Sequence, residues 1–212
     1  MDIEILKPTE IEKRSFEIIG QELKERGIVL PEGLAPVIKR CIHTTADFDY
    51  ATSLCFFDGA IKTFQNLIRQ GAAIVTDTNM ALSGINKKTL QKYGVRAHCY
   101  MSEEAIAKEA ARRELTRAAV SMEHAMRSDG PVIFVIGNAP TALVTLYEHY
   151  KAHDYTPAFI VGVPVGFVNV EAAKELILQT DIPHIVNRGR KGGSNVAAAI
   201  VNAMLYGMEE RV

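Results

Sequence analysis

The sequence has few cysteines, no long apolar run and no excess of charge of one sign. The three cysteines, Cys41, Cys55 and Cys99, are never closer than fourteen residues, which excludes a disulfide framework and any C-x-x-C metal or redox site. The 24 basic and 25 acidic side chains leave a net charge of −1, so no overall field steers the protein onto nucleic acid or an anionic membrane. The lack of disulfides favours a protein of a reducing compartment. The balanced charge leads us to expect that it binds neither nucleic acid nor a membrane.

Membrane-spanning and targeting patterns are also missing. The longest uncharged apolar stretch, residues 158–168, contains two glycines and a proline and is far shorter than the ~20 residues that cross a bilayer. The first eight residues include two acidic side chains, unlike the basic start of a signal peptide. We expect a cytoplasmic chain that begins at its own start. No linker or repeat divides it, so a single domain of residues 1–212 is predicted.

Familiar nucleotide-binding and hydrolase motifs are absent as well. The sequence contains no G-x-G-x-x-G, no G-x-x-x-x-G-K-[ST] and no G-x-S-x-G, so a dinucleotide site, a P-loop and a nucleophile elbow have no support. His149 and His153 stand four residues apart, a spacing that can hold a metal, but no H-E-x-x-H pattern or third ligand accompanies them. We interpret both as the solvated end of a helix and expect no metal site.

Two helices are predicted at the start of the chain, over residues 9–26 and 31–43. The first begins with a capping box formed by Thr9 and Glu12 and ends at Gly27. Its apolar stripe places Ser15 on or beside the buried face, where a polar side chain needs a partner. The second helix ends near His43, since the threonines and the aspartate that follow are poor helix-interior residues.

From residue 71 onward the apolar pattern alternates between strand-like and helix-like periods. This alternation favours an α/β fold with a mainly parallel five-stranded sheet covered by helices on both faces. The N-terminal helices, residues 9–43, are expected to pack on that α/β core, residues 71–208. The predicted strands are residues 72–76, 96–100, 132–136, 158–162 and 184–187, and the predicted helix caps are Asn86, Ser102, Asn169 and Ser194, with Ser102 before one long helix over residues 103–127.

Ligands of such sheets bind outside the carboxyl ends of the strands. Three of the predicted strand-end loops carry glycines and run into a helix N-terminus, where free backbone N–H groups favour an anion. The last of these loops has Arg188, Arg190 and Lys191, followed by Gly192 and Gly193. The glycines let the backbone approach a ligand closely, and Arg190 or Lys191 would pair with a carboxylate or phosphate. The alternative is a tight turn whose charges are solvated.

A second polar cluster lies at the end of the second helix. Arg40 and His43 are three residues apart, so both emerge on one side of the last turn. A histidine with an ordinary pKa of ~6.5 gives or takes a proton near neutral pH, which makes His43 a candidate general acid or base. The alternative is a capping histidine that bonds a backbone carbonyl. Asp47 and Asp49 are further candidates for acid–base or metal chemistry, although Asx-turn roles are commoner in connections.

Five blocks of the sequence resemble the successive signature segments of precorrin-8X methylmutase, the precorrin isomerase family of the cobalamin pathway. The match runs in order over nearly the whole chain, and the blocks together are far more specific than any one of them. The first block is similar to the branch of the family that works on cobalt-containing intermediates. The blocks are RCIHTTADFDY (residues 40–50), IVTDTNMALSGI (74–85), GNAPTAL (137–143), GVPVGFVN (162–169) and GRKGGSNVAA (189–198).

The resemblance implies a three-layer, flavodoxin-like, doubly wound α/β fold and a homodimer. It implies an isomerase that moves a methyl group from C11 to C12 of the tetrapyrrole cobalt-precorrin-8, or of precorrin-8X, to give cobyrinate or hydrogenobyrinate. No cofactor is implied. His43 matches the family's catalytic histidine, for which the proposed role is to protonate the macrocycle as a general acid.

The resemblance also implies substrate-binding residues. Ser15 and Arg40 match family positions that contact the substrate. Arg117 resembles a position that reaches a ligand across the dimer, although an arginine on a helix is usually a solvated or paired charge. Arg190 and Lys191 fall in a matching block, and the sequence leaves open which of them touches a carboxylate.

Two other functions are compatible with parts of this pattern. A non-catalytic tetrapyrrole carrier would need the same cleft without a titrating His43. A flavodoxin-like protein that binds phosphate or FMN would be supported by the fold and the basic glycine loop alone. The pairing of Arg40 with His43, together with five matching blocks, favours the isomerase.

Overall fold

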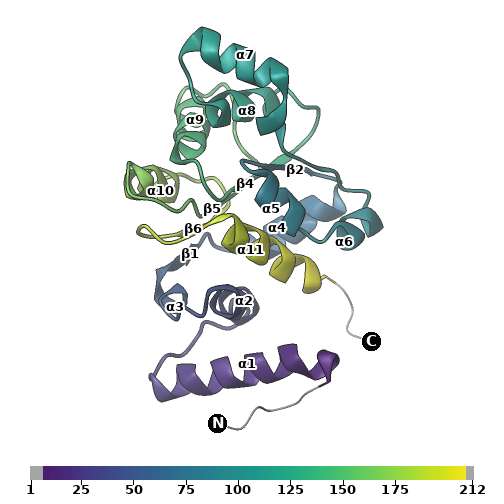
Figure 1. Ribbon diagram of the computed structural model, residues 1–212, viewed down its shortest axis with the longest axis vertical. Helices are drawn as coiled ribbons and strands as arrows, with labels where there is room; N and C mark the ends of the chain where they lie inside the picture. Colours follow the sequence, from purple (N-terminus) through teal and green to yellow (C-terminus); the bar gives the residue numbers. More distant parts are fainter. Residues whose placement is uncertain (1–6, 209–212) are drawn as a thin grey trace.

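A six-stranded sheet runs through the middle of the computed structural model, in which residues 7–208 are described (Figure 1). The strand order is β1-β6-β5-β4-β2-β3, and every neighbouring pair is parallel except β1 with β6. Numbered along the chain, the five parallel strands have the spatial order 2-1-3-4-5. The strands are β1 (Leu54–Phe56), β2 (Ala73–Thr76), β3 (Ala97–His98), β4 (Val132–Ile136), β5 (Phe159–Gly162) and β6 (His184–Asn187).

All five predicted strands are present, but the predicted count of five is wrong because it omits β1. This strand has three residues, follows directly on the short helix α3 (Tyr50–Ser53), and pairs antiparallel with β6 through Leu54 opposite Asn187 and Phe56 opposite Ile185. It lies at the sheet edge, and of its three residues only Leu54 is buried. A strand this short has no alternation that a sequence pattern can reveal.

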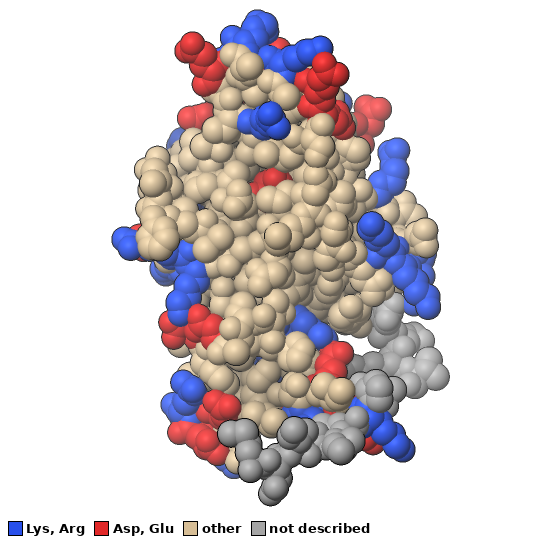
Figure 2. Space-filling view, viewed as in Figure 1, with Lys and Arg blue, Asp and Glu red and all other residues tan. Residues whose placement is uncertain are grey.

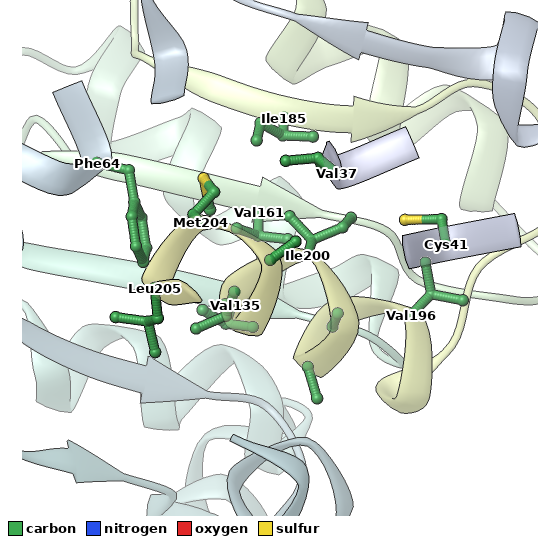
Figure 3. Close-up of a cluster of buried hydrophobic side chains, with 14 of the residues drawn as sticks. Val37, Cys41, Phe64, Val135, Val161, Ile185, Val196, Ile200, Met204 and Leu205 are labelled. Carbon is green, nitrogen blue, oxygen red and sulfur yellow. The ribbon is translucent and has the colours of Figure 1, made fainter. Parts of the chain in front are cut away.

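Helices cover both faces of the sheet, as the continuous apolar strands predicted. Along β4, Ile133 and Val135 point into one cluster, and Val132, Phe134 and Ile136 point into the other. The first cluster includes α4 (Ala60–Arg69) and α11 (Ser194–Tyr206), whose Val196, Ile200 and Met204 lie against the sheet in Figure 3. The second includes α8 (Arg117–Ala125), α9 (Pro140–Lys151) and α10 (Val170–Leu178).

The two N-terminal helices form a further layer outside α11. Helix α2 (Ala35–Thr45) packs on α11 through Val37 and Cys41, and α1 (Pro8–Glu25) packs on α2 (Figures 1 and 3). Through these contacts α2 lies against α11, and α1 lies outside α2. Helix α2 begins four residues later than predicted and continues two residues beyond His43.

The predicted capping box of α1 is wrong. The helix begins at Pro8, so its N-cap is Lys7, and the Lys7 amide donates to the carboxylate of Glu10 at 3.4 Å. A proline at the first helical position explains this start, since its fixed φ suits a helix and its missing N–H is not needed there. Glu12 is thereby free to contact Arg40 on α2.

The long helix predicted over residues 103–127 is two helices. Helix α7 (Glu104–Arg113) ends at Glu114, which has a left-handed φ of 55°, and α8 begins after Thr116, whose hydroxyl accepts from the Ala119 amide. Glu103, not Ser102, precedes α7, and Gly193, not Ser194, precedes α11. Asn86 and Asn169 precede the helices predicted for them. The remaining elements are α5 (Asn79–Gly84), α6 (Lys87–Lys92) and the 3-10 helix η1 (Tyr100–Ser102).

Within residues 7–208 no helix has the length and apolar character that a membrane span requires.

Candidate active site

A cleft of about 360 Å³ lies between α2, α5 and α11, and it contains both His43 and Arg40. Small residues line the contact between α5 and α11 at this cleft. Gly84 of α5 lies so close to α11 that an added Cβ would be 2.8 Å from Cβ of Ala198. The polar and apolar groups of the lining come from all three helices. The lining residues are Arg40, His43, Thr44, Met80, Gly84, Asn195, Ala198, Ala199, Asn202 and Tyr206.

His43 presents an exposed imidazole to this cleft from the last turn of α2. Its ring stacks on Phe16 of α1 with centroids 5.4 Å apart and planes 24° from parallel. Within residues 7–208 its ring nitrogens have no hydrogen-bond partner, and the hydroxyls of Thr44 and Thr45 donate to the nearby carbonyls of Arg40 and Cys41. The imidazole is therefore left available for chemistry.

Arg40 lies one turn before His43, between two aromatic rings. Its guanidinium carbon is 4.8 Å from the Phe16 centroid and 5.4 Å from the Tyr206 centroid, an arrangement that suits cation–π contact. Its Nη2 donates to Glu12 at 2.5 Å, whereas its Nε is buried and has no partner among the described residues. The guanidinium is thus held in place, and one buried donor, Nε, has no partner among the described residues.

A second hollow of about 780 Å³ adjoins the first and shares Arg40 and Tyr206 with it. It lies between α1 and α2, with Phe16 in its wall. Ser15 is half-buried on α1, and its hydroxyl donates to the Ile11 carbonyl at 3.0 Å. The hydrogen-bond partner expected for this buried-face serine is therefore a carbonyl of its own helix. Ser15 lines neither hollow.

The three other predicted binding residues do not line the cleft. Arg117 is exposed at the start of α8. Arg190 is exposed and donates from Nε to Glu171 at 3.1 Å. Lys191 reaches in the other direction, to the segment after α2, where its Nζ is 2.5 Å from Asp47 and 2.6 Å from Asp49.

Two of the predicted anion-binding loops have their amides occupied by the protein itself. In the loop before α9, the amides of Gly137, Asn138 and Ala139 donate to the carboxylate of Asp77 at 2.7–2.8 Å. Burial raises the pKa of Asp77, while these amides favour its charged form. In the loop before α11, the Gly193 amide donates to the Val163 carbonyl at 2.9 Å. The glycines thus permit contact between backbone segments.

Sequence reasoning missed the buried lysine of α10. The side chain of Lys174 is inaccessible to solvent, and its Nζ donates to the carbonyls of Gly189 at 2.6 Å and Lys191 at 2.8 Å. Burial lowers its pKa to about 8. In the sequence Lys174 stands between an alanine and a glutamate of an amphipathic segment, where a lysine is normally solvated, so no sequence signal distinguishes it.

We expect Lys174 to make folding stability depend on pH. Its pKa is about 8 when folded, against 10.5 as the ordinary value, so between these limits the unfolded state binds more protons and the lysine favours folding more as pH rises. Cys41 acts oppositely above pH 9, because burial raises its pKa from 9.0 to about 12. The measurement is therefore the unfolding free energy of the wild type minus that of Lys174→Met. This difference should rise from pH 8 to pH 10 by at most about 1.4 kcal/mol per unit; a flat difference contradicts the assignment.

Metal ligands do not gather in the described part of the chain: no group of three or more His, Cys, Asp or Glu residues is placed to hold an ion. His149 is half-buried and lies 2.8 Å from Asp154 at the end of α9, so it is not the solvated residue that the sequence predicted.

Charge is distributed unevenly over the face that carries the cleft. In Figure 2 the charged side chains gather around α7 at one end, around α1 at the other and along the margins, and the middle, over α5 and α11, is almost free of them. Nearby loops expose apolar side chains, with Phe167 83% and Val168 78% accessible. A largely apolar face, a cleft with one imidazole and a fixed guanidinium define an α/β protein suited to a large apolar ligand that carries carboxylates.

Comparison with known proteins identifies the family. The family model described as precorrin-8X methylmutase matches residues 10–207. The chain is 42% identical to cobalt-precorrin-8 methylmutase of Salmonella typhimurium, over 97% of this chain and 98% of that protein, and 36% identical to precorrin-8X methylmutase of Pseudomonas aeruginosa, over 92% and 93%. The crystal structure of precorrin-8X methylmutase from Thermus thermophilus superposes with a TM-score of 0.82 at 33% identity, covering 93% of this chain and 96% of that one.

The chain belongs to the precorrin-8X methylmutase family. It is a methylmutase, an isomerase of cobalamin biosynthesis, and the resemblance seen in the sequence is confirmed.

Proposed function

We propose that the protein moves a methyl group from C11 to C12 of cobalt-precorrin-8, with His43 as the general acid that protonates the macrocycle. The observation that carries the proposal is the exposed imidazole of His43 in a cleft beside the fixed guanidinium of Arg40. The Salmonella, Priestia and Leptospira relatives, at 38–42% identity, bear the name of the cobalt-containing substrate. Cobalt enters as part of the substrate, and the reaction needs no added cofactor.

For this reaction the protein has to position the macrocycle and supply one proton to it. Because the methyl shift is intramolecular, the cleft has to hold the macrocycle, keep water away and present an acid at the correct atom. The stack on Phe16 fixes the plane of the His43 ring, and its nitrogens have no competing partner among the described residues. Because substrate and product are isomers, the proton that His43 donates returns to its imidazole once the methyl group is bonded to C12, and the product is then released.

Arg40 supplies an anchor for one carboxylate of the substrate rim. Glu12 accepts from its Nη2 in the structure, so an incoming carboxylate takes the place that Glu12 holds. The aromatic rings on both sides keep the guanidinium oriented during this exchange. Ser15, on the same helix as Glu12, is a second proposed contact, made when its hydroxyl turns from the Ile11 carbonyl to the substrate.

The remaining proposals concern assembly. We infer a single domain with a flavodoxin-like arrangement, because the parallel strands have the order 2-1-3-4-5 that such folds share. We infer a homodimer that covers the uncharged face and brings Arg117 of one protomer toward the ligand of the other. Arg190, paired with the exposed Glu171, remains a proposed contact for a substrate carboxylate. A cytoplasmic location completes the proposal.

The test is conversion of the pigment. Purified protein is mixed with cobalt-precorrin-8 and, separately, with the metal-free form, and the visible spectrum is followed. Conversion of the cobalt form at the higher kcat/KM is expected. Binding of both pigments without conversion of either would support the carrier, which the family does not favour. A flavin-binding function has little support, because Asp77 occupies the amides before α9 that a phosphate would need.

A further inference from the structure

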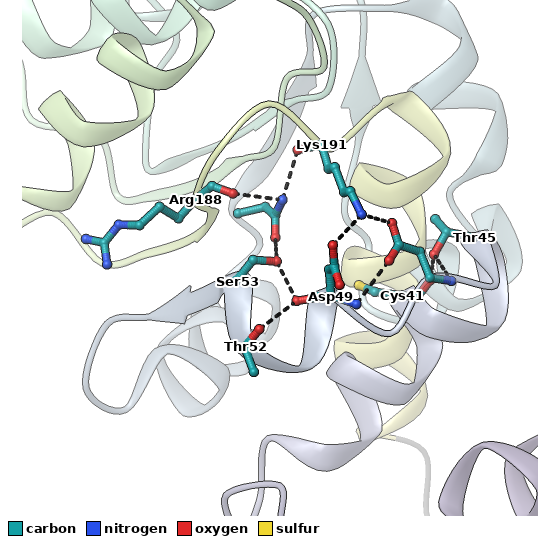
Figure 4. Close-up of polar contacts among 9 residues, drawn as sticks. Cys41, Thr45, Asp49, Thr52, Ser53, Arg188 and Lys191 are labelled. Atoms are coloured by element: carbon teal, nitrogen blue, oxygen red, sulfur yellow. Dashed lines mark hydrogen bonds and ion pairs between the residues drawn. The ribbon is translucent and has the colours of Figure 1, made fainter. Parts of the chain in front are cut away.

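One lysine joins two segments that lie about 140 residues apart in the sequence. Nζ of Lys191, in the loop between β6 and α11, is 2.5 Å from Oδ2 of Asp47 and 2.6 Å from Oδ2 of Asp49. The two aspartates follow directly on α2, whose C-cap is Ala46. Figure 4 shows the amine of Lys191 between the two carboxylates.

These contacts join two walls of the cleft. His43 belongs to the last turn of α2, four residues before Asp47. The loop of Lys191 leads into α11, which contributes Asn195, Ala198 and Ala199 to the opposite wall. The side chain of Lys191 therefore links the end of α2 to the loop that begins α11, in addition to the packing of α2 on α11.

The backbone carbonyl of Lys191 is also held by hydrogen bonds from buried side chains. It accepts from the buried Nζ of Lys174 at 2.8 Å and from Nδ2 of Asn187 at 2.9 Å. Oδ1 of Asn187 lies 2.6 Å from the hydroxyl of Ser53, which also lies 2.8 Å from the carbonyl of Asp49. A network of hydrogen bonds thus connects the loop and the segment after α2, as Figure 4 shows in part.

The pairing persists through the neutral range. The two carboxylates raise the pKa of Lys191, and the hydrogen bond from Lys191 lowers the pKa of Asp47. The amine therefore stays charged and occupied, and the carboxylate of Asp47 stays ionised near neutral pH. This occupancy argues against the substrate contact that the sequence suggested for Lys191.

We propose that Lys191 is a positioning residue for the methyl shift: by holding Asp47 and Asp49, it fixes the end of α2, and with it the imidazole of His43, against the loop that begins α11. The proposal rests on the proposed function of His43. It assigns Lys191 no contact with the macrocycle.

Steady-state kinetics separate positioning from substrate binding. Lys191→Met is expected to lower kcat by about 10- to 100-fold, the loss that a small misplacement of a reacting group can cause, with KM nearly unchanged. Lys191→Arg, which keeps both ion pairs, should recover most of kcat. The double variant Asp47→Asn, Asp49→Asn should lose kcat to the same extent, and adding Lys191→Met to it should cause little further loss, because one interaction is removed in each case. This double variant also serves if Lys191→Met does not fold.

A lysine that bound the substrate would behave differently. Lys191→Met would then raise KM, and the two asparagines would free the amine and lower KM; either result overturns the proposal. Arg188→Met is the matched control, since Arg188 lies in the same loop and pairs with Glu175 on α10, away from the cleft. Its kcat should equal that of the wild type.

A readout without turnover tests the proposal independently of the proposed function. The ring-proton NMR shifts of His43 report its stack on Phe16. Lys191→Met should move these signals in the free protein, and Arg188→Met should leave them in place. Unchanged His43 signals in Lys191→Met overturn the positioning role even where the enzyme converts substrate, whereas a wild type that converts no pigment contradicts only the function proposed for the cleft.

Discussion

Replacing His43 by alanine is expected to lower kcat by about 10²–10⁴-fold, the usual contribution of a positioned general acid. The imidazole is the only ionisable ring among the residues that line the cleft apart from the phenol of Tyr206. Removing it leaves the hollow beside Phe16 larger and the guanidinium of Arg40 in place. The variant should therefore still bind the corrin product, with a dissociation constant close to that of the wild type.

The measurement is conversion of cobalt-precorrin-8 followed by absorbance, with product affinity measured in parallel by titration. His43→Gln tests shape, because it keeps a polar side chain without an acid, and it should be as slow as His43→Ala. His153→Asn is a control: this histidine is exposed at the far end of α9, and asparagine tolerates its left-handed φ of 59°. A fully active His43→Ala would remove the acid from the proposed mechanism.

Replacing Asp77 by alanine is expected to lower the free energy of unfolding by about 3 kcal/mol or more, because three hydrogen bonds to a buried carboxylate are lost and each contributes about 1.5–3 kcal/mol. Three amides, of Gly137, Asn138 and Ala139, lose their acceptor together. For a protein of this size such a loss corresponds to a fall in Tm of roughly 10 °C.

Asp77→Asn refines this prediction. Its amide oxygen still accepts, but its NH₂ group faces donors that the carboxylate satisfied, so the variant should be less stable than the wild type and more stable than Asp77→Ala. Thermal unfolding followed by circular dichroism measures all three proteins. Asp129→Asn, at an exposed position before β4, is the control. An Asp77→Ala protein with an unchanged Tm would show that water replaces the carboxylate without cost.

The periodic part of the fold was predictable from the sequence, and the contacts between distant segments were not. Residues such as Ile133 and Val135 belong to a continuous apolar run, and this pattern indicates a buried parallel strand wherever it occurs. Strand β1 escaped prediction because three residues carry no period, and its pairing with β6 is set by tertiary contacts. Proline at the first position of α1 outweighed the capping box that followed it.

The candidate site divides in the same way. His43 and Arg40 could be predicted because their spacing along one helix guarantees that they lie together. The roles of Lys191 and Asp77 could not, since Lys191 meets Asp47 across 144 residues and Asp77 meets Ala139 across 62. The sequence pattern of cations and glycines suggests that these loops bind an anionic ligand. Only the fold shows that carboxylates of the protein itself, those of Asp47, Asp49 and Asp77, already occupy the positions of such an anion.

The packing of α2 on α11 also bears on how the protein becomes active during synthesis. Helix α2 ends at Thr45 and its partner begins at Ser194, so the two walls of the cleft come from opposite ends of the chain. Contacts of such sequence separation form late, because a long loop must be closed first. A nascent chain that has completed the sheet through β5 still lacks the wall that faces His43. Acid and cleft therefore come together only when the final helix has left the ribosome, and a chain truncated before residue 194 should fold in part without acquiring activity.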